Sequence, residues 1–223
     1  MRNHSISAFG LLLLLSLSLL ARPASAGSSF EFLWNSSSVD DDDEWFLHLA
    51  VNNYGYPRTV IEPVVPRLRY VEADLPVVLF LAHQSGRPVD FIVNLRSEGL
   101  GWSVIFTRVG VPYDVLFVGI DRDPGPPYGK AWGHWKKQRK HFRPSDDVIC
   151  GLVNVQTAHR VTGLSSFDVA RARGHGKSFA SVVAEKKGRP RHDGSSGKGN
   201  GGAPGAKKGG GHGKEGKGGG KGH

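Results

Sequence analysis

The chain has 223 residues, with 29 lysines and arginines against 20 aspartates and glutamates and a formal net charge of +9 at pH 7. This length allows one domain of moderate size, since domains usually run to about 100–150 residues. The chain has a single cysteine, Cys150, so an internal disulfide is excluded and packing must hold the fold. We expect Cys150 to be a small buried apolar residue on a helix; an intermolecular disulfide is the alternative.

Residues 1–26 are predicted to be a secretory signal peptide. Arg2 and His4 precede an apolar run over 9–20, and an Ala-x-Ala cleavage site follows at 24–26. The run is too short for a permanent membrane anchor, which takes about 20 apolar residues. We therefore expect an exported protein, periplasmic or extracellular, with no transmembrane segment after cleavage.

Residues 27–43 are expected to be a polar linker, because the serines at 36–38 and the aspartates at 40–43 offer little to a core. Asp43 is expected to help cap a helix that begins near Glu44, since acidic side chains are favourable at a helix N-terminus. No calcium site is expected here, because adjacent aspartates lack the alternating spacing of a calcium loop.

A repeated stretch organises the helical domain that we predict over residues 44–187. Residues 75–110 align without gaps on residues 152–187, and each copy carries the pattern G-x5-[IV]-x3-R-x2-G-x2-[WF]-x2-[IV]. Self-similarity at a fixed spacing is the signature of a duplicated supersecondary unit. A weaker partial copy, 44–70, departs from the pattern after Ile61. The pattern falls on Gly86, Ile92, Arg96, Gly99, Trp102 and Ile105, and then on Gly163, Val169, Arg173, Gly176, Phe179 and Val182.

Each full copy, 75–110 and 148–187, is predicted to form short helices separated by glycines. In the first copy, apolar residues recur at helical spacing over 75–82, 89–96 and 102–109, and glycines close each stretch. No helix is expected to exceed about a dozen residues, so none would be stable alone in water. The sequence therefore predicts a compact all-α fold, a small helical repeat array in which the copies bury one another's apolar faces.

The insert between the full copies, residues 111–146, holds the most function-like side chains. Its apolar run over 113–120 fits either a short helix or an extended segment, and 123–129 must be a loop because of its proline and glycine content. A helix after this loop would place Tyr128, Trp132 and Trp135 on one face. Five basic residues surround that stripe: Lys130, Lys136, Lys137, Arg139 and Lys140.

Two interpretations of this stripe are compatible with the sequence. Aromatic rings beside cations can stack on bases or sugars while the cations hold phosphate or carboxylate groups. The segment would then be a specific nucleic-acid or glycan binding site. Alternatively, the rings pack the insert onto the domain and the lysines are simply solvated, which is the commoner use of such a stripe.

The tail, residues 188–223, is predicted to be disordered because it is rich in glycine and charge and nearly free of apolar residues. From Lys186 onward, ten bases against two acids carry about eight of the nine net positive charges, so we attribute the basic balance to the tail. Such a tail binds polyanions through counterion release: anionic lipid headgroups, wall polymers or extracellular nucleic acid. A solubilising extension is the alternative. The candidate polyanion-binding residues are Lys198, Lys207, Lys208, Lys214, Lys217 and Lys221.

No catalytic residue, cofactor or metal site is expected. The HExxH, GxSxG and paired CxxC motifs are absent from the sequence. Gly176-Lys177-Ser178 looks like the end of a phosphate-binding loop, but Arg171 stands where that motif needs glycine, so we interpret it as a turn. His83 and His159 are placed at the helix surface, and the tail histidines lack zinc-site spacing. We expect a non-enzymatic protein; an enzyme of unknown type is the remaining alternative.

The repeated pattern, the PPYGKAWGHWKK insert and the Gly/Lys-rich tail together resemble a group of exported bacterial proteins of uncharacterised function. The resemblance covers about residues 44–187. It implies a bacterial source and a helical fold, and it brings no activity, cofactor or catalytic residue. The sequence thus predicts a non-enzymatic exported protein with a helical interaction domain and a cationic tail for anionic surfaces.

Overall fold

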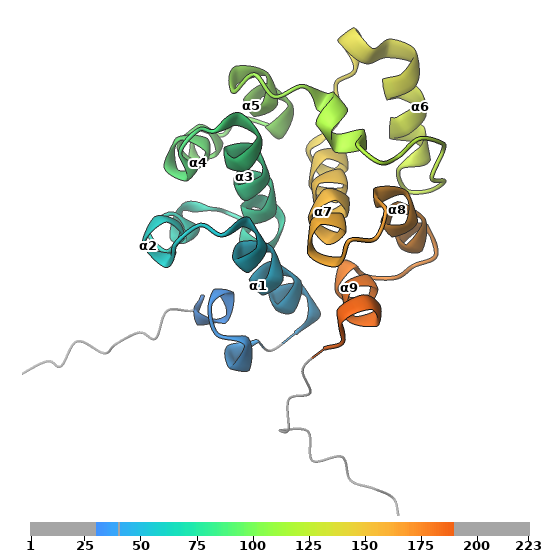
Figure 1. Ribbon diagram of the computed structural model, residues 1–223. Coiled ribbons are helices and arrows are strands. Elements are labelled where there is room, and N and C mark those ends of the chain that lie inside the picture. Colours follow the sequence, from blue (N-terminus) through green and yellow to red (C-terminus); the bar gives the residue numbers. More distant parts are fainter. Residues whose placement is uncertain (1–29, 40, 190–223) are drawn as a thin grey trace, which may run out of the picture. The chain divides into compact units, whose positions relative to one another are not determined.

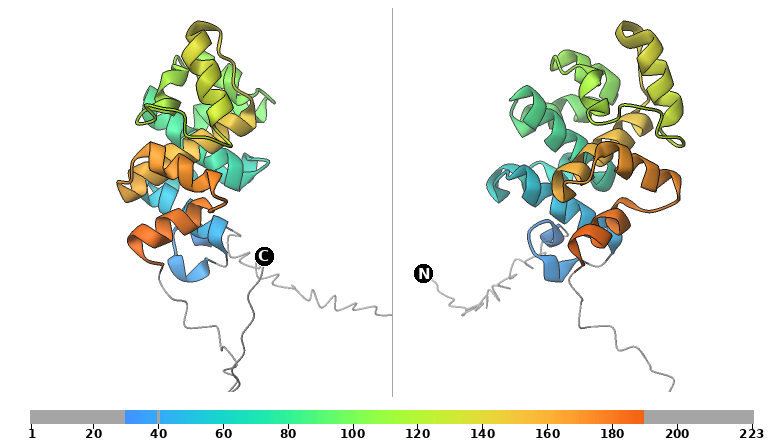
Figure 2. Two further views of the ribbon diagram at one scale, coloured as in Figure 1. Left: turned by 90° about the vertical axis from the view of Figure 1, so that its right-hand side faces the viewer. Right: turned by 45° about the vertical axis from the view of Figure 1, so that its right-hand side comes forward.

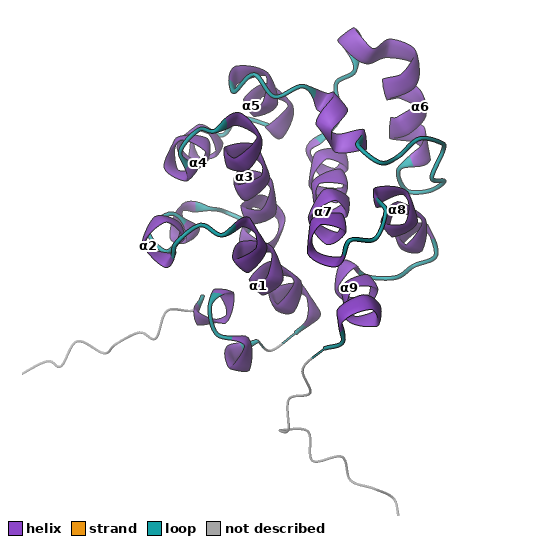
Figure 3. Cartoon of the chain, in the orientation of Figure 1, coloured by secondary structure: helices purple, strands orange, loops and turns teal. Residues whose placement is uncertain are grey.

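The computed structural model describes residues 30–39 and 41–189. The predicted signal peptide and the tail from residue 190, with its six candidate lysines, lie outside these described residues. Within them the chain forms helices and turns and no strand, which confirms the predicted all-α fold class (Figure 3). None of the helices in this part of the chain has both the length and the apolar character needed to cross a membrane.

Two long helices, α3 (Val71–Ser85) and α7 (Asp146–Thr162), pack against each other at the centre of the domain (Figure 1). Buried residues run without a break from Asp74 to Ala82 in α3. A helix that is apolar on nearly all sides must be covered on all sides, and α1 (Asp42–Tyr54), α4 (Val89–Ser97) and α7 do so. With 15 and 17 residues, α3 and α7 are longer than the predicted limit of about a dozen residues. Their burial against each other stabilises helical turns that intrinsic helix propensity alone would not.

The shorter helices flank this central pair. Figure 1 shows α2 (Arg58–Ile61), α4 and α5 (Trp102–Arg108) on the α3 side, and α6 (Gly129–Gln138), α8 (Ser166–Gly174) and α9 (Phe179–Lys187) on the α7 side. Single 3-10 turns connect them: η1 (Glu31–Leu33), η2 (Ser36–Ser38), η3 (Val65–Arg67), η4 (Tyr113–Phe117) and η5 (Arg139–His141). The apolar run at 113–120 is therefore partly helical, and Leu116, Phe117 and Ile120 are buried in the core.

Glycines end the long helices where the sequence predicts breaks. Gly55, Gly86 and Gly163 follow α1, α3 and α7 with φ of 73°, 66° and 73°. Gly99 and Gly176, between the second and third helix of each full copy, both have φ of 83°. Side chains other than glycine rarely adopt this left-handed conformation. The observed bounds of α4 and α5 agree with the predicted 89–96 and 102–109 within one residue.

The segment predicted as a linker is part of the fold, so the domain begins before Glu44. Phe32, Leu33 and Val39 are buried in the core, and η1 packs on α1. The capping residue of α1 is Asp41 and not Asp43: its Oδ1 accepts hydrogen bonds from the amides of Asp43 and Glu44, both at 2.9 Å. The burial of these three apolar side chains is enough to hold the segment against the domain, although serines and aspartates surround them in the sequence.

The C-terminal end of the described domain packs against its first α-helix. Helices α1 and α9 lie side by side, and Arg189 forms an ion pair with Asp42 in the first turn of α1. The Arg189 guanidinium also lies 5.7 Å from the ring centroid of Trp45. Figure 2 shows this edge at one end of the domain and α6 at the other.

Candidate functional site

The aromatic stripe of the insert faces the protein interior. Tyr128 and Trp135 are only 5% and 6% exposed, and Trp132 is half-buried against the core. The Trp135 ring stacks on Phe117 at 4.5 Å between centroids, and its Nε1 donates to Asp114 at 2.7 Å. The Nε1 of Trp132 donates to the backbone carbonyl of Ile120 at 3.1 Å. The indole N–H groups are thus satisfied within the domain, as buried indoles require.

The ring of Tyr128 packs on α7 at Gly151, where the absence of a side chain leaves room for it. A Cβ at Gly151 would lie 2.8 Å from Cε1 of the Tyr128 ring. Burial raises the pKa of Tyr128, and the nearby Arg173 guanidinium, by hydrogen bonding and charge, acts in the opposite direction. Of the two interpretations of the stripe, packing onto the domain describes Tyr128 and Trp135, because protein atoms already cover these rings.

The cations of the insert remain on the surface. Lys130, Lys136 and Lys137 are exposed, and within the described residues none of them forms an ion pair. The Nζ of Lys136 lies 5.5 Å from the Trp132 ring centroid and 5.6 Å from that of Trp135. Arg139 differs, since it lies 4.3 Å from the Trp135 centroid and pairs with Asp114 at 3.2 Å. Lys140 belongs to η5, and the position of its side chain is outside the description.

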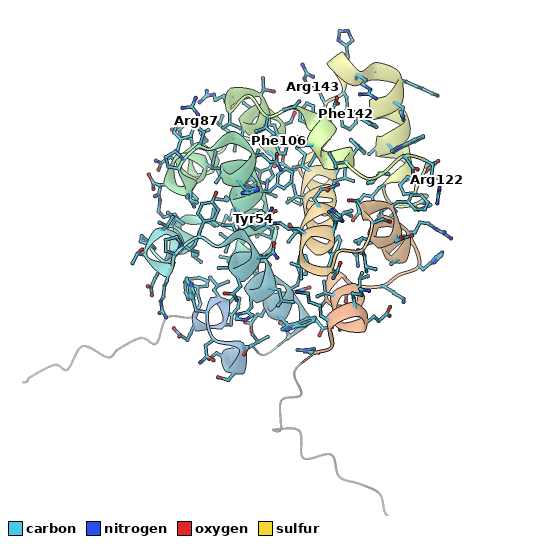
Figure 4. All side chains as sticks on the ribbon, viewed as in Figure 1. Tyr54, Arg87, Phe106, Arg122, Phe142 and Arg143 are labelled. Atoms are coloured by element: carbon cyan, nitrogen blue, oxygen red, sulfur yellow. The ribbon has the colours of Figure 1, made fainter. Side chains whose placement is uncertain are left out.

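The folded part carries its charge very unevenly, although the tail from Lys186 onward accounts for most of the net charge of the chain. Residues 30–121 contain six lysines and arginines against thirteen acids, and residues 122–189 contain fourteen against five. These two halves therefore have formal charges of −7 and +9. Helices α6 to α9 lie opposite α2, α4 and α5, and Figure 4 shows Arg122 on the first side and Arg87 on the second. We call residues 122–189 the basic side of the domain.

Arg96, the arginine of the first copy of the repeated pattern, has a structural role. Arg96 lies over the Trp102 ring and pairs with Asp74 at 3.0 Å and with Asp146 at 2.8 Å. The Nε1 of Trp102 also donates to Asp74, at 3.2 Å, and the Asp74 side chain is 2% exposed. Asp146 accepts the backbone N–H of Trp102 at 2.8 Å and so binds the first turn of α5. This cluster ties α3, α4, α5 and α7 together.

Sequence reasoning missed one group of side chains, at the ends of three helices. Tyr54, His83, His159 and Arg160 line a common cavity. The two histidines were expected at the helix surface, and His83 is exposed whereas His159 is half-buried. Helical spacing does bring His159 and Arg160 to the last turn of α7, but no local pattern indicates that α1 and α3 end beside them.

Within the described residues, no group of three or more histidine, cysteine, aspartate or glutamate side chains is arranged to hold a metal ion. No protein-family model, curated protein or solved structure matches the chain. Any functional conclusion therefore rests on the residues and contacts of this chain itself.

Proposed function

We propose that this protein is an exported, non-enzymatic binding protein that attaches to anionic polymers or lipid surfaces through the basic side of its helical domain and its cationic tail. The observation that carries the proposal is the concentration of fourteen bases against five acids in residues 122–189, directly before a tail with seven bases and two acids. Adjacent cations bind polyanions by releasing condensed counterions and steer them by long-range attraction.

The lysines of α6 support this proposal because no acid among the described residues forms an ion pair with them. Lys136 and Lys137 lie in the last turn of α6, where cations interact favourably with the helix dipole. The buried tryptophans below hold the helix against the core, so the cations stand on a fixed support. Anionic headgroups or phosphate chains would meet these lysines without any stacking on the aromatic rings.

The proposal includes a duplicated origin for the two helix triplets α3–α5 and α7–α9. Matching glycine conformations and an arginine over the first aromatic residue of each third helix support it. In this view the insert between the copies supplied α6 and its cations, and the second copy supplied most of the remaining bases of the basic side.

Sedimentation of the mature full-length chain with vesicles tests the surface binding. One set of vesicles contains phosphatidylglycerol in phosphatidylcholine, another contains phosphatidylcholine alone, and a parallel titration uses linear polyphosphate. One variant replaces Lys130, Lys136 and Lys137 by glutamine, and another replaces the six tail lysines. The matched control replaces Arg87 and Arg108, which lie in the acidic half.

Each lysine near an anionic surface contributes roughly 1 kcal/mol. The triple variant should therefore lose up to about a hundredfold in affinity for one of the anionic probes, and the control variant should bind like the parent. Equal retention of all proteins, or equal retention on neutral and anionic vesicles, would contradict the proposal. Mass spectrometry of the protein secreted by a bacterial host tests export: cleavage after Ala26 supports it, and an intact N-terminus in the cytoplasm refutes it.

A further inference from the structure

A cavity of about 230 Å³ opens where the last turns of α1, α3 and α7 meet. Tyr54, His83 and Arg160 reach it from these three helices, and Val115 and Val118 line it from η4 and the residue after it. Figure 4 shows Tyr54 in the middle of the domain, between α3 and α7. None of the residues that line the cavity is an acid.

The polar side of the cavity contains a cation without a counter-ion. Arg160 forms no ion pair with any described residue; its Nη1 lies 3.1 Å from Nε2 of His83, and its guanidinium lies 5.3 Å from the Tyr54 ring centroid. A guanidinium only donates, so Nε2 of His83 must accept and the imidazole proton is assigned to Nδ1. Burial, and then the charge of Arg160, lower the pKa of His83, which favours the neutral form of this ring. The other N–H groups of Arg160 are available to a ligand.

The remaining polar groups have defined roles. Nδ1 of His159 donates to the carbonyl of Leu164 at 2.5 Å, so its Nε2 is unprotonated in the neutral ring. The Tyr54 hydroxyl bonds to Thr157 at 3.1 Å. The amide nitrogen of Gln156 donates to the carbonyls of Leu116 and Val118, both at 3.0 Å. Gln156 therefore fixes the η4 wall of the cavity and is not free for a ligand.

The rest of the lining is largely apolar: Phe80, Val115 and Val118 and the ring of Tyr54 contribute to it. A ligand that fits both the cation and this apolar lining carries one negative group and a compact apolar body. The planar guanidinium matches a carboxylate through two parallel hydrogen bonds. Because three helix C-termini, which carry partial negative charge, converge here, a doubly charged phosphate is less favourable than a singly charged carboxylate.

We infer that this cavity binds a small monocarboxylate with an aromatic or short aliphatic body, with Arg160 as the carboxylate ligand. The volume is below the usual range of about 300–1,000 Å³ for ligand pockets, which favours a ligand of benzoate size. This site is separate from the lysines of α6 and the tail, and it is independent of the polyanion binding proposed above.

Calorimetric titration of the mature full-length chain at 150 mM salt tests the inference, with benzoate, hexanoate, benzyl alcohol and phenyl phosphate as probes. The key variant is Arg160→Gln, and Arg171→Gln on α8 is its matched control, because Arg171 is also exposed and unpaired by acids but does not line the cavity. Val118→Trp fills the mouth of the cavity without removing charge. Circular dichroism confirms that each variant remains helical.

Benzoate or hexanoate should bind the parent and Arg171→Gln equally, and at least about tenfold more weakly to Arg160→Gln and to Val118→Trp. Benzyl alcohol and phenyl phosphate should bind more weakly than benzoate. The inference is overturned if neither carboxylate binds the parent, if Arg160→Gln binds as the parent does, or if phenyl phosphate is the preferred probe.

Discussion

The guanidinium of Arg173 lies 4.5 Å from the ring centroid of Phe179. Arg96 and Trp102 have the same relationship in the first copy, at 4.6 Å. Both arginines also donate through Nη1 to the backbone carbonyl two residues before the aromatic residue. The arginine and the aromatic residue of the repeated pattern thus close the turn between the second and third helix, which explains their spacing in mechanical terms.

The two turns differ in the side chain that lies beside the arginine. Asp74 of α3 pairs with Arg96, whereas the corresponding position in α7 is Gly151, and the Tyr128 ring occupies the vacated space. A phenol from the insert therefore stands where the first copy has a carboxylate.

Replacing Gly151 by alanine should destabilise the domain by about 1–3 kcal/mol, the usual cost of overpacking. The new Cβ would lie 2.8 Å from Cε1 of Tyr128. Gly133→Ala in α6 is the matched control: nothing lies within 4 Å of its Cβ position, so it should be neutral or stabilising by up to about 1 kcal/mol. Urea unfolding followed by circular dichroism measures both. Equal midpoints for the two variants would show that Tyr128 does not pack on α7.

Asp74→Asn should cost about 3 kcal/mol or more, because it breaks a buried ion pair and leaves Arg96 partly uncompensated. The same change at Asp90, whose ion pair with Arg67 is exposed, should cost less than about 1 kcal/mol. Thermal unfolding of the two variants gives the comparison. A similar loss of stability in both would mean that the Asp74 cluster does not hold the helices together.

Leu33→Ala should destabilise the domain by about 2–5 kcal/mol, as expected for a fully buried leucine. Ser36→Ala, three residues later and exposed, should leave the unfolding free energy within about 0.5 kcal/mol of the parent. Urea unfolding distinguishes the packed segment from the linker that the sequence favours. If Leu33→Ala behaves like Ser36→Ala, the linker interpretation is correct.

Cys150 should react slowly with thiol reagents. Burial, and then the charges of Asp74 and Asp146, raise the pKa of its thiol from 9.0 to about 12. At pH 8 the thiolate fraction is then lower by about a thousandfold than for an ordinary cysteine. The reaction rate with a disulfide reagent falls by a smaller factor, because a thiolate of higher pKa is more nucleophilic. The measurement compares folded protein with protein in urea. Rapid reaction of the folded protein would contradict the burial.

The same thiol makes stability depend on pH in the alkaline range. Because the folded-state pKa is raised, the folded state binds more protons than the unfolded state between about pH 9 and pH 12. The free energy of unfolding should therefore fall as pH rises through this window. Cys150→Ala should reduce this slope, and an unchanged slope would assign it to other groups.

The sequence predicts the helix ends well because the requirement at these positions is local. Gly86 and Gly163 need a positive φ, which other residues avoid, so a glycine after an apolar helical stretch is a reliable signal. Leu33 was missed since a few apolar residues in a polar segment do not raise its average hydrophobicity. For Tyr128, helical spacing gives the face on which the ring lies but not what covers that face.

The candidate cavity was beyond the sequence for a different reason. His83 and Arg160 lie on separate helices far apart in the chain, and only the packing of α3 on α7 brings their side chains to 3.1 Å. Neither residue belongs to the repeated pattern. The charge imbalance between the halves, in contrast, can be predicted by counting residues. It is missed when residues 44–187 are treated as one unit, because the two halves then largely cancel.

The pairing of Arg189 with Asp42 has a practical consequence for handling this protein. Since η1 and α9 both pack on α1, at the end of the domain away from α6, reporters or carriers fused to both boundaries would crowd that end and leave α6 unobstructed. A short peptide joining the two boundaries, with new termini opened in the 123–129 loop, should give a circular permutant that keeps the helix packing.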